Sequence, residues 1–163
     1  MPNFSLKTEA WPNADQELWV SLTEPASLFE AGGHLANLSS ATLKNISVSY
    51  GRWIFWLTSE EPQALEAPPL ARITANRVAM WLKSTENLAP SSQKLWLDGL
   101  IRLVIAASPK TEIEFLRNHQ RRLLQLSQNS RGSRKIGRVP SSFDLIGGSR
   151  PSSWCNFPGG LRA

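Results

Sequence analysis

The sequence predicts an all-α fold, a small bundle of four to five helices. Apolar residues recur at three- and four-residue spacing, strand-like alternation is scarce, and proline and glycine divide the chain into segments of helical length. The chain has 163 residues, which suits one domain with tails or two very small domains. Its single cysteine, Cys155, excludes an intrachain disulfide framework and a multi-cysteine zinc site.

An N-terminal leader precedes the predicted bundle. Its residues Asp15–Glu30 predict one or two short helices, interrupted at Pro25. The pair Gly32-Gly33 ends this stretch, since glycine favours the end of a helix. We therefore expect residues 1–37 to form a leader with short helices.

The first bundle helix is predicted over about Ala41–Thr58. Ser39 or Ser40 supplies a side-chain oxygen that can cap it. Phe55 and Trp56 lie outside its apolar face, so we expect this helix to bury more than one side. The face itself follows helical spacing and consists of Leu43, Ile46, Tyr50, Trp53, Ile54 and Leu57.

A proline-containing connection leads to the next two helices. The segment Glu60–Leu70 contains three prolines and cannot be helical throughout. Thr74 caps a helix over about Ala75–Asn87, and Pro90 fits the first turn of a helix that runs to about Ala107. The helix that begins at Pro90 is apolar nearly all round, as expected of a central helix. Its apolar residues are Leu95, Trp96, Leu97, Leu100, Ile101, Leu103, Val104 and Ile105.

The last helix is predicted over about Glu112–Gln128. Thr111 and Glu114 have the spacing of a capping box. The apolar side of the helix consists of Ile113, Leu116, Leu123 and Leu124. From residue 129 onward, seven Ser, six Gly and three Pro among 35 residues predict a basic linker and a disordered tail over 129–163.

The charge of the chain is distributed unevenly. Residues 1–70 hold eight acidic and three basic residues, a net charge of −5, whereas residues 71–163 hold fifteen basic and five acidic residues, a net charge of +10. Such a division favours a polyanionic partner over a neutral ligand. A basic tail that merely aids solubility is the alternative.

Basic side chains along the predicted helices and linker are the candidate nucleic-acid contacts. Lysine and arginine neutralise phosphates and release counterions, which gives affinity without sequence preference. Arginine can also bind guanine edges where a helix enters a major groove. The candidate residues are Arg77, Lys83, Lys94, Arg102, Arg117, Arg121, Arg122, Arg131, Arg134, Lys135 and Arg138.

Patterns typical of catalysis or of cofactor binding are scarce. The two histidines, His34 and His119, have no metal-ligand partner at helical or turn spacing, and no glycine-rich phosphate loop is present. We therefore expect no enzyme activity, cofactor or metal. The longest apolar runs are far shorter than a membrane span and no secretory signal opens the chain, so we expect a cytoplasmic protein without membrane contact.

An ordered series of motifs resembles a known family. The segments LSSAT (38–42), YGRWIFWL (50–57), ARITANRV (71–78) and LAPSS (88–92) follow one another as in the N-terminal core-binding domain of tyrosine site-specific recombinases, the phage integrases. The resemblance covers Leu38 to about Leu126. It implies a SAM-like helical domain over 38–128 that binds double-stranded DNA, with other recombinase protomers as further candidate partners.

The sequence departs from the family where strand cleavage would occur. Its only tyrosine, Tyr50, lies in the first bundle helix, and the H-x-x-R pattern at His119–Arg122 lies in the last one. Beyond Leu145 the family likeness ends. We therefore expect a DNA-binding module of an integrase-like protein that is truncated before the catalytic domain and does not cut DNA.

Two alternatives remain open at this point. The chain could be a protein-interaction module that uses aromatic surface around Phe55 and Trp56, or a non-functional remnant of a mobile-element integrase. For the DNA-binding hypothesis, neutralisation of about six phosphates predicts weak binding with a log–log salt slope of roughly −5.

Overall fold

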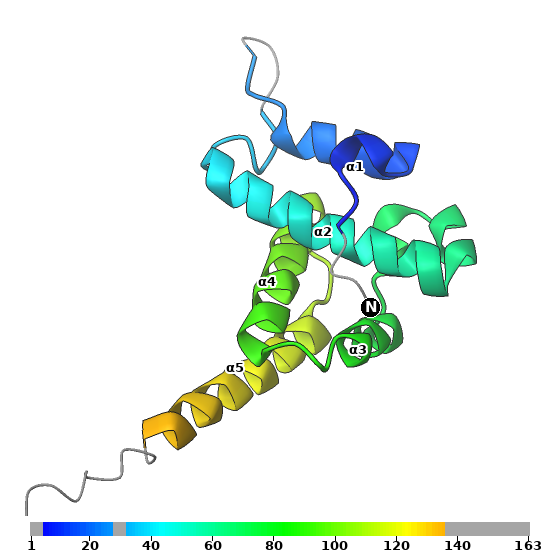
Figure 1. The fold of residues 1–163 in the computed structure, drawn as a ribbon. Coiled ribbons are helices and arrows are strands. Elements are labelled where there is room, and N and C mark those ends of the chain that lie inside the picture. The colour runs from blue at the N-terminus through cyan, green and yellow to red at the C-terminus, as the bar shows by residue number, and fades with distance from the viewer. Residues whose placement is uncertain (1–4, 28–31, 136–163) are drawn as a thin grey trace, which may run out of the picture.

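The protein folds as a helical bundle from which one helix projects (Figure 1). The structure is a computed structural model that describes residues 5–27 and 32–135, and side chains as far as residue 129. Within these ranges lie five α-helices, three short 3₁₀ helices and no strand, which confirms the predicted all-α class. The predicted tail from residue 136 onward lies outside the described residues.

Helices α2 (Ser40–Glu60) and α4 (Pro90–Ala107) form the centre of the bundle. Ser39 caps α2 by accepting a hydrogen bond from the Thr42 N–H, as predicted. Trp56, outside the predicted apolar face, is only 4% exposed, so α2 does bury more than one side. Helix α4 has nine buried residues, which confirms its central place.

Helix α4 is apolar nearly all round, as the sequence predicts, but one stripe of it faces outward. Leu95 is 53% exposed and Ile105 is 39% exposed, and Arg102 between them is also exposed. These residues lie at three- and seven-residue spacing on one face of the helix. Neighbouring helices leave this face uncovered, so apolar sequence alone did not determine what is buried.

Helices α2 and α4 approach each other closely at Gly99. A Cβ atom at Gly99 would lie 2.4 Å from Oγ and 2.5 Å from Cβ of Ser49. Gly99→Ala is therefore expected to lower the free energy of unfolding by about 1–3 kcal/mol through overpacking. The double variant Ser49→Gly/Gly99→Ala restores space and should be more stable than the sum of the two single changes indicates. Urea denaturation of the four proteins measures this coupling, and additive losses would contradict a contact limited by these two residues.

Four tryptophans join α2, α3 (Ala75–Ser84) and α4 in one cluster. The ring of Trp53 lies 5.3 Å from that of Trp56 and 5.4 Å from that of Trp81, and Trp81 stacks on Trp96 at 6.4 Å. Such ring pairs add to the free energy gained by area burial. The cluster fixes α3 against the two central helices.

The N-terminal leader packs on the bundle through α1 (Asn13–Thr23). Trp11 is 3% exposed and meets Tyr50 edge to face at 5.2 Å. The backbone from Glu24 to Ser27 is not helical, so the predicted interruption at Pro25 is confirmed, and the rest of the predicted stretch to Glu30 lies outside the described residues. Pro25 disfavours the helical conformation at the residue before it.

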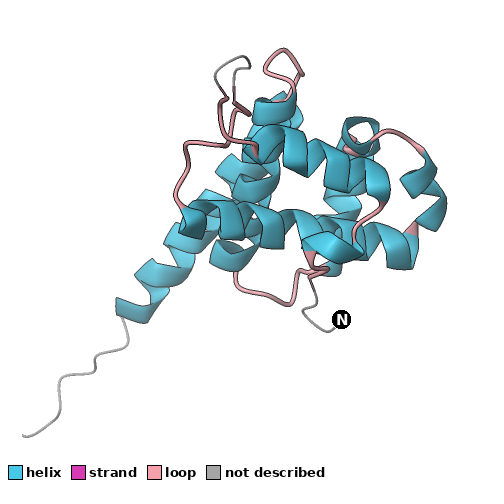
Figure 2. Ribbon diagram, turned by 90° about the horizontal axis from the view of Figure 1, so that it is seen from above, coloured by secondary structure: helices cyan, strands magenta, loops and turns pink. Residues whose placement is uncertain are grey.

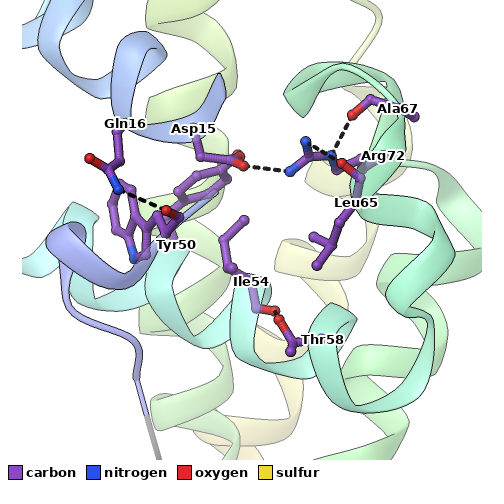
Figure 3. A network of polar contacts seen from close by, with 9 residues as sticks. Asp15, Gln16, Tyr50, Ile54, Thr58, Leu65, Ala67 and Arg72 are labelled. Carbon is purple, nitrogen blue, oxygen red and sulfur yellow. Dashed lines mark hydrogen bonds and ion pairs between the residues drawn. The ribbon is translucent and has the colours of Figure 1, made fainter. Parts of the chain in front are cut away.

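A buried polar network connects α1 and α2 with η3 (Pro69–Arg72) (Figure 3). The Arg72 guanidinium lies 2.6 Å from one carboxylate oxygen of Asp15, and the Tyr50 hydroxyl donates to the other at 2.5 Å. Arg72 also donates to the carbonyls of Ala67 and Leu65. Every charge in the network thus has a partner, which a charge in the interior requires.

Helix α3 ends three residues earlier than the sequence predicts. Thr74 caps its start by accepting from the Arg77 N–H, as expected. At its end, the Gln93 amide donates to the carbonyls of Leu82 and Thr85. Because this side chain from α4 takes up the Leu82 carbonyl, which the Glu86 N–H would use in a longer helix, the chain turns at Thr85.

Helix α5 (Glu114–Lys135) differs from its prediction at both ends. It begins two residues late, since the Thr111 N–H donates to the Ser108 carbonyl in a turn and the first helical bond runs from the Arg117 N–H to the Ile113 carbonyl. The predicted capping box is therefore wrong. The helix also continues seven residues beyond Gln128, into the segment predicted as linker.

Candidate nucleic-acid interface

Helix α5 divides into a packed half and a free half. Leu116 and Leu123 are buried against the bundle, where α5 contacts α4 and α3. The rest of the helix projects beyond the other helices, as both views show (Figures 1 and 2). A helix of 22 residues is about 33 Å long, so the free half reaches far from the core.

The charge of α5 has one sign along most of its length. From Phe115 to Lys135 the helix contains six basic and no acidic residues. Such a helix gains little from its own side-chain pairs and repels a second helix of the same kind. It is suited to a negatively charged surface.

Three predicted contacts, Arg117, Arg121 and Arg122, are exposed on α5. Arg117 and Arg122 form no ion pair with any described residue. Arg121 lies 2.9 Å from the Glu114 carboxylate and donates to the Asn118 side-chain oxygen at 2.7 Å. Because its side chain is 62% exposed, this pair contributes little to stability and can be exchanged for a phosphate.

The outward stripe of α4 lies beside the same region of α5. Asp98 accepts from the Gln120 amide of α5 at 2.6 Å, and Lys94 lies 2.6 Å from the other carboxylate oxygen of Asp98. Arg102, one turn after Asp98, is exposed and forms no ion pair among the described residues. The Asp98–Gln120 contact therefore places this part of α4, which carries Arg102, beside the packed half of α5.

The two candidates on α3 differ from each other. Arg77 is 26% exposed, lies 2.7 Å from Glu61 and also donates to the Arg72 carbonyl, so an acidic neighbour already occupies it. Lys83 is exposed and has no ion-pair partner within the described part of the chain. Arg77 thus has a structural role in the bundle, whereas the Lys83 side chain remains accessible to a partner.

The remaining four candidates lie at the end of α5 or past it. The backbone at positions 131, 134 and 135 is helical, which extends the basic run of α5 rather than placing it in a linker. Arg138 lies outside the described residues. The complete absence of acidic residues from 115 to 135 was the sequence signal for this continuous basic helix.

Sequence reasoning missed Arg52 and the amide side chains of α5. The Arg52 guanidinium lies 4.0 Å from the centre of the Trp96 ring, a cation–π contact, and burial lowers its pKa. Gln125 and Gln128 are exposed and make no hydrogen bond with a described residue. Isolated amides carry no periodic pattern, so only the projecting helix makes them noticeable.

Other features considered in the sequence are structural in this fold. Tyr50 is fully buried, burial together with the Asp15 carboxylate raises its pKa, and its hydroxyl donates to that carboxylate within the buried network. Burial, and secondarily Arg122, lowers the pKa of His119. The expected aromatic patch is absent at Trp56, which is buried.

The described residues offer neither a metal-binding cluster nor a membrane-spanning helix. No group of three or more His, Cys, Asp and Glu side chains among them could hold a metal ion. None of the helices within the described ranges combines the length and apolar character needed to cross a bilayer.

Comparison of the chain with protein-family models, with characterised proteins and with solved structures finds no match.

Proposed function

We propose that this chain binds double-stranded DNA without cleaving it, and that α5 is its principal contact. The observation that carries the proposal is the projecting helix with six basic and no acidic residues between 115 and 135. Phosphate contacts from such residues position a protein on a duplex. The resemblance of 38–126 to the core-binding domain of tyrosine recombinases supports the same partner.

The expected binding is electrostatic in origin. Arg117 and Arg122 are unpaired among the described residues, and Arg121 has only an exposed partner, so neutralisation of phosphates disrupts little of the folded structure. Arg102 of α4 is a further exposed cation without an ion pair among the described residues. With about six phosphates neutralised, non-specific dissociation constants around 10⁻⁴ to 10⁻⁶ M and a log–log salt slope of roughly −5 are expected.

The test compares the salt dependence of two variants of equal charge. Arg117→Ala/Arg121→Ala/Arg122→Ala should reduce the magnitude of the salt slope by about 2.7, since each lost contact removes about 0.9. Fluorescence anisotropy of a labelled duplex across a salt series measures the slope. Between 50 and 200 mM salt, this difference corresponds to a roughly 40-fold smaller loss of affinity for the variant.

The matched control removes three positive charges from other elements. Lys7, Lys44 and Lys110 are exposed on the leader, on α2 and in the α4–α5 connection. Lys7→Ala/Lys44→Ala/Lys110→Ala has the same net charge as the α5 variant and should keep the wild-type slope. Equal slopes for the two variants would show that net charge, not α5, governs binding. Absence of binding by the wild type even at low salt would disprove the proposal itself.

A further inference from the structure

We propose that the outward side of α2 around Arg52 docks an acidic peptide segment of a partner protein. The Arg52 side chain is half-buried, and its guanidinium lies 4.0 Å from the centre of the Trp96 ring. No described residue forms an ion pair or a hydrogen bond with this guanidinium. The site lies on a different helix from the proposed DNA contact and is independent of it.

Among the described residues, the other two arginines that are not exposed each hold a carboxylate. Arg72 lies 2.6 Å from Asp15, and Arg77 lies 2.7 Å from Glu61. The Nε–H of Arg52, in contrast, is shielded from solvent without an acceptor, and burial lowers the pKa of this guanidinium. Its terminal Nη groups keep contact with solvent. A carboxylate from outside the described chain would therefore complete an ion pair that the fold leaves open.

A second cation lies on the same side of α2, two turns before Arg52. Val48 precedes Arg52 by four residues and Lys44 precedes it by eight, so the three side chains form a row along the helix. The row is about 12 Å long, at 1.5 Å per residue. Its middle member, Val48, is half-buried and apolar. The row therefore combines a cation at each end with an apolar contact between them.

A pocket of about 270 Å³ between α2 and the leader includes part of this row. Lys44 and Val48 line it from α2, and Lys7 lines it from the leader. Both lysines are exposed and form no ion pair with a described residue. Glu9 also lines the pocket, and its carboxylate accepts from the Thr8 hydroxyl at 3.2 Å. Two cations against one carboxylate leave the pocket positive, which suits an acidic partner.

The chemistry of the row fits an extended peptide better than a nucleic acid. Acidic residues four positions apart in an extended peptide are about 13 Å apart, close to the distance between the ends of the row. An apolar side chain between them would contact Val48, whereas the backbone of a duplex presents phosphates and sugars there. Arginine binds a carboxylate through two parallel hydrogen bonds, which the planar guanidinium of Arg52 can donate.

Selection of displayed random peptides on the full chain tests the docking site. Peptides with acidic residues next to apolar ones should be enriched. Fluorescence anisotropy of a selected, labelled peptide should show binding that Arg52→Met weakens by about 10- to 150-fold. Arg52→Lys keeps the charge but not the planar donor pair, so it should restore only part of the affinity. Replacement of the peptide's carboxylates by amides should weaken binding to the wild type in the same way, without any change in the protein.

An exposed arginine on another helix provides the control. Arg102 forms no ion pair among the described residues, and Arg102→Met should bind the selected peptide as the wild type does. Arg52→Met should keep the salt slope of DNA binding. Enrichment of peptides without acidic residues, or equal peptide binding by the two variants, would overturn the docking site. A smaller salt slope after Arg52→Met would assign Arg52 to DNA and overturn it as well, whereas absence of DNA binding would overturn the proposed function alone.

Discussion

Arg72→Met is expected to lower the free energy of unfolding by about 3–5 kcal/mol, since it leaves a buried charge without its partner. Arg72 and Asp15 are 1% and 0% exposed and lie 2.6 Å apart. The substitution keeps much of the side-chain volume, so the loss reports the charge rather than a cavity. Because a domain of this size is stable by only about 5–15 kcal/mol, the midpoint of urea denaturation should fall markedly.

A surface pair of similar geometry serves as the control for Arg72. Arg77 lies 2.7 Å from Glu61, but the two side chains are 26% and 28% exposed. Arg77→Met is therefore expected to cost no more than about 1 kcal/mol. The double variant Asp15→Leu/Arg72→Met should lose less than the sum of its single changes, because neither charge remains buried alone. Equal losses for Arg72→Met and Arg77→Met would show that burial of the pair has no special weight.

Trp53→Ala is expected to lower the free energy of unfolding by about 3–5 kcal/mol through loss of buried area and formation of a cavity. The Trp53 side chain is fully buried and contacts the rings of Trp56 and Trp81. Loss of this ring removes the ring contact between Trp53 of α2 and Trp81 of α3. Urea denaturation, monitored by far-UV circular dichroism, measures the change in the free energy of unfolding.

Two further variants separate area from polarity at this site. The Trp53 indole N–H is buried without a hydrogen-bond partner among the described residues, so Trp53→Phe also removes an unsatisfied donor. We expect Trp53→Phe to cost clearly less than Trp53→Ala. Leu95→Ala, at a side chain that is 53% exposed, should change stability only slightly. A loss for Trp53→Ala as small as that for Leu95→Ala would contradict the assignment of the tryptophan cluster to the core.

Local chemistry accounts for the elements that were predicted correctly. Helix-start signals act within a few residues, so the sequence alone predicts them. Examples are Pro90 at the first turn of α4 and the caps at Ser39 and Thr74. The capping pattern at Thr111 failed because a competing turn formed there. Local patterns thus predict residues at which a helix can begin. Hydrogen bonds of the adjacent backbone determine at which of these residues it does begin.

The candidate interface was predictable in its charge but not in its arrangement. Arg117 and Arg77 look alike in the sequence, yet only Arg77 meets an acidic residue, Glu61, sixteen positions away. The sequence predicted a linker from residue 129, because its serine and glycine content outweighed helix propensity there, whereas α5 continues to Lys135. A candidate contact therefore cannot be judged until its distant neighbours are known.

The amino-acid sequence by itself determined the all-α class, most helix positions and the basic C-terminal half, since each depends on periodicity, caps or composition. Tertiary structure alone decided that Asp15, Tyr50 and Arg72 share a buried network and that α5 leaves the bundle. The physical reason is distance along the chain. Asp15 and Arg72 are 57 residues apart, and only the packing of α1 and α2 with η3 gives each charge its partner.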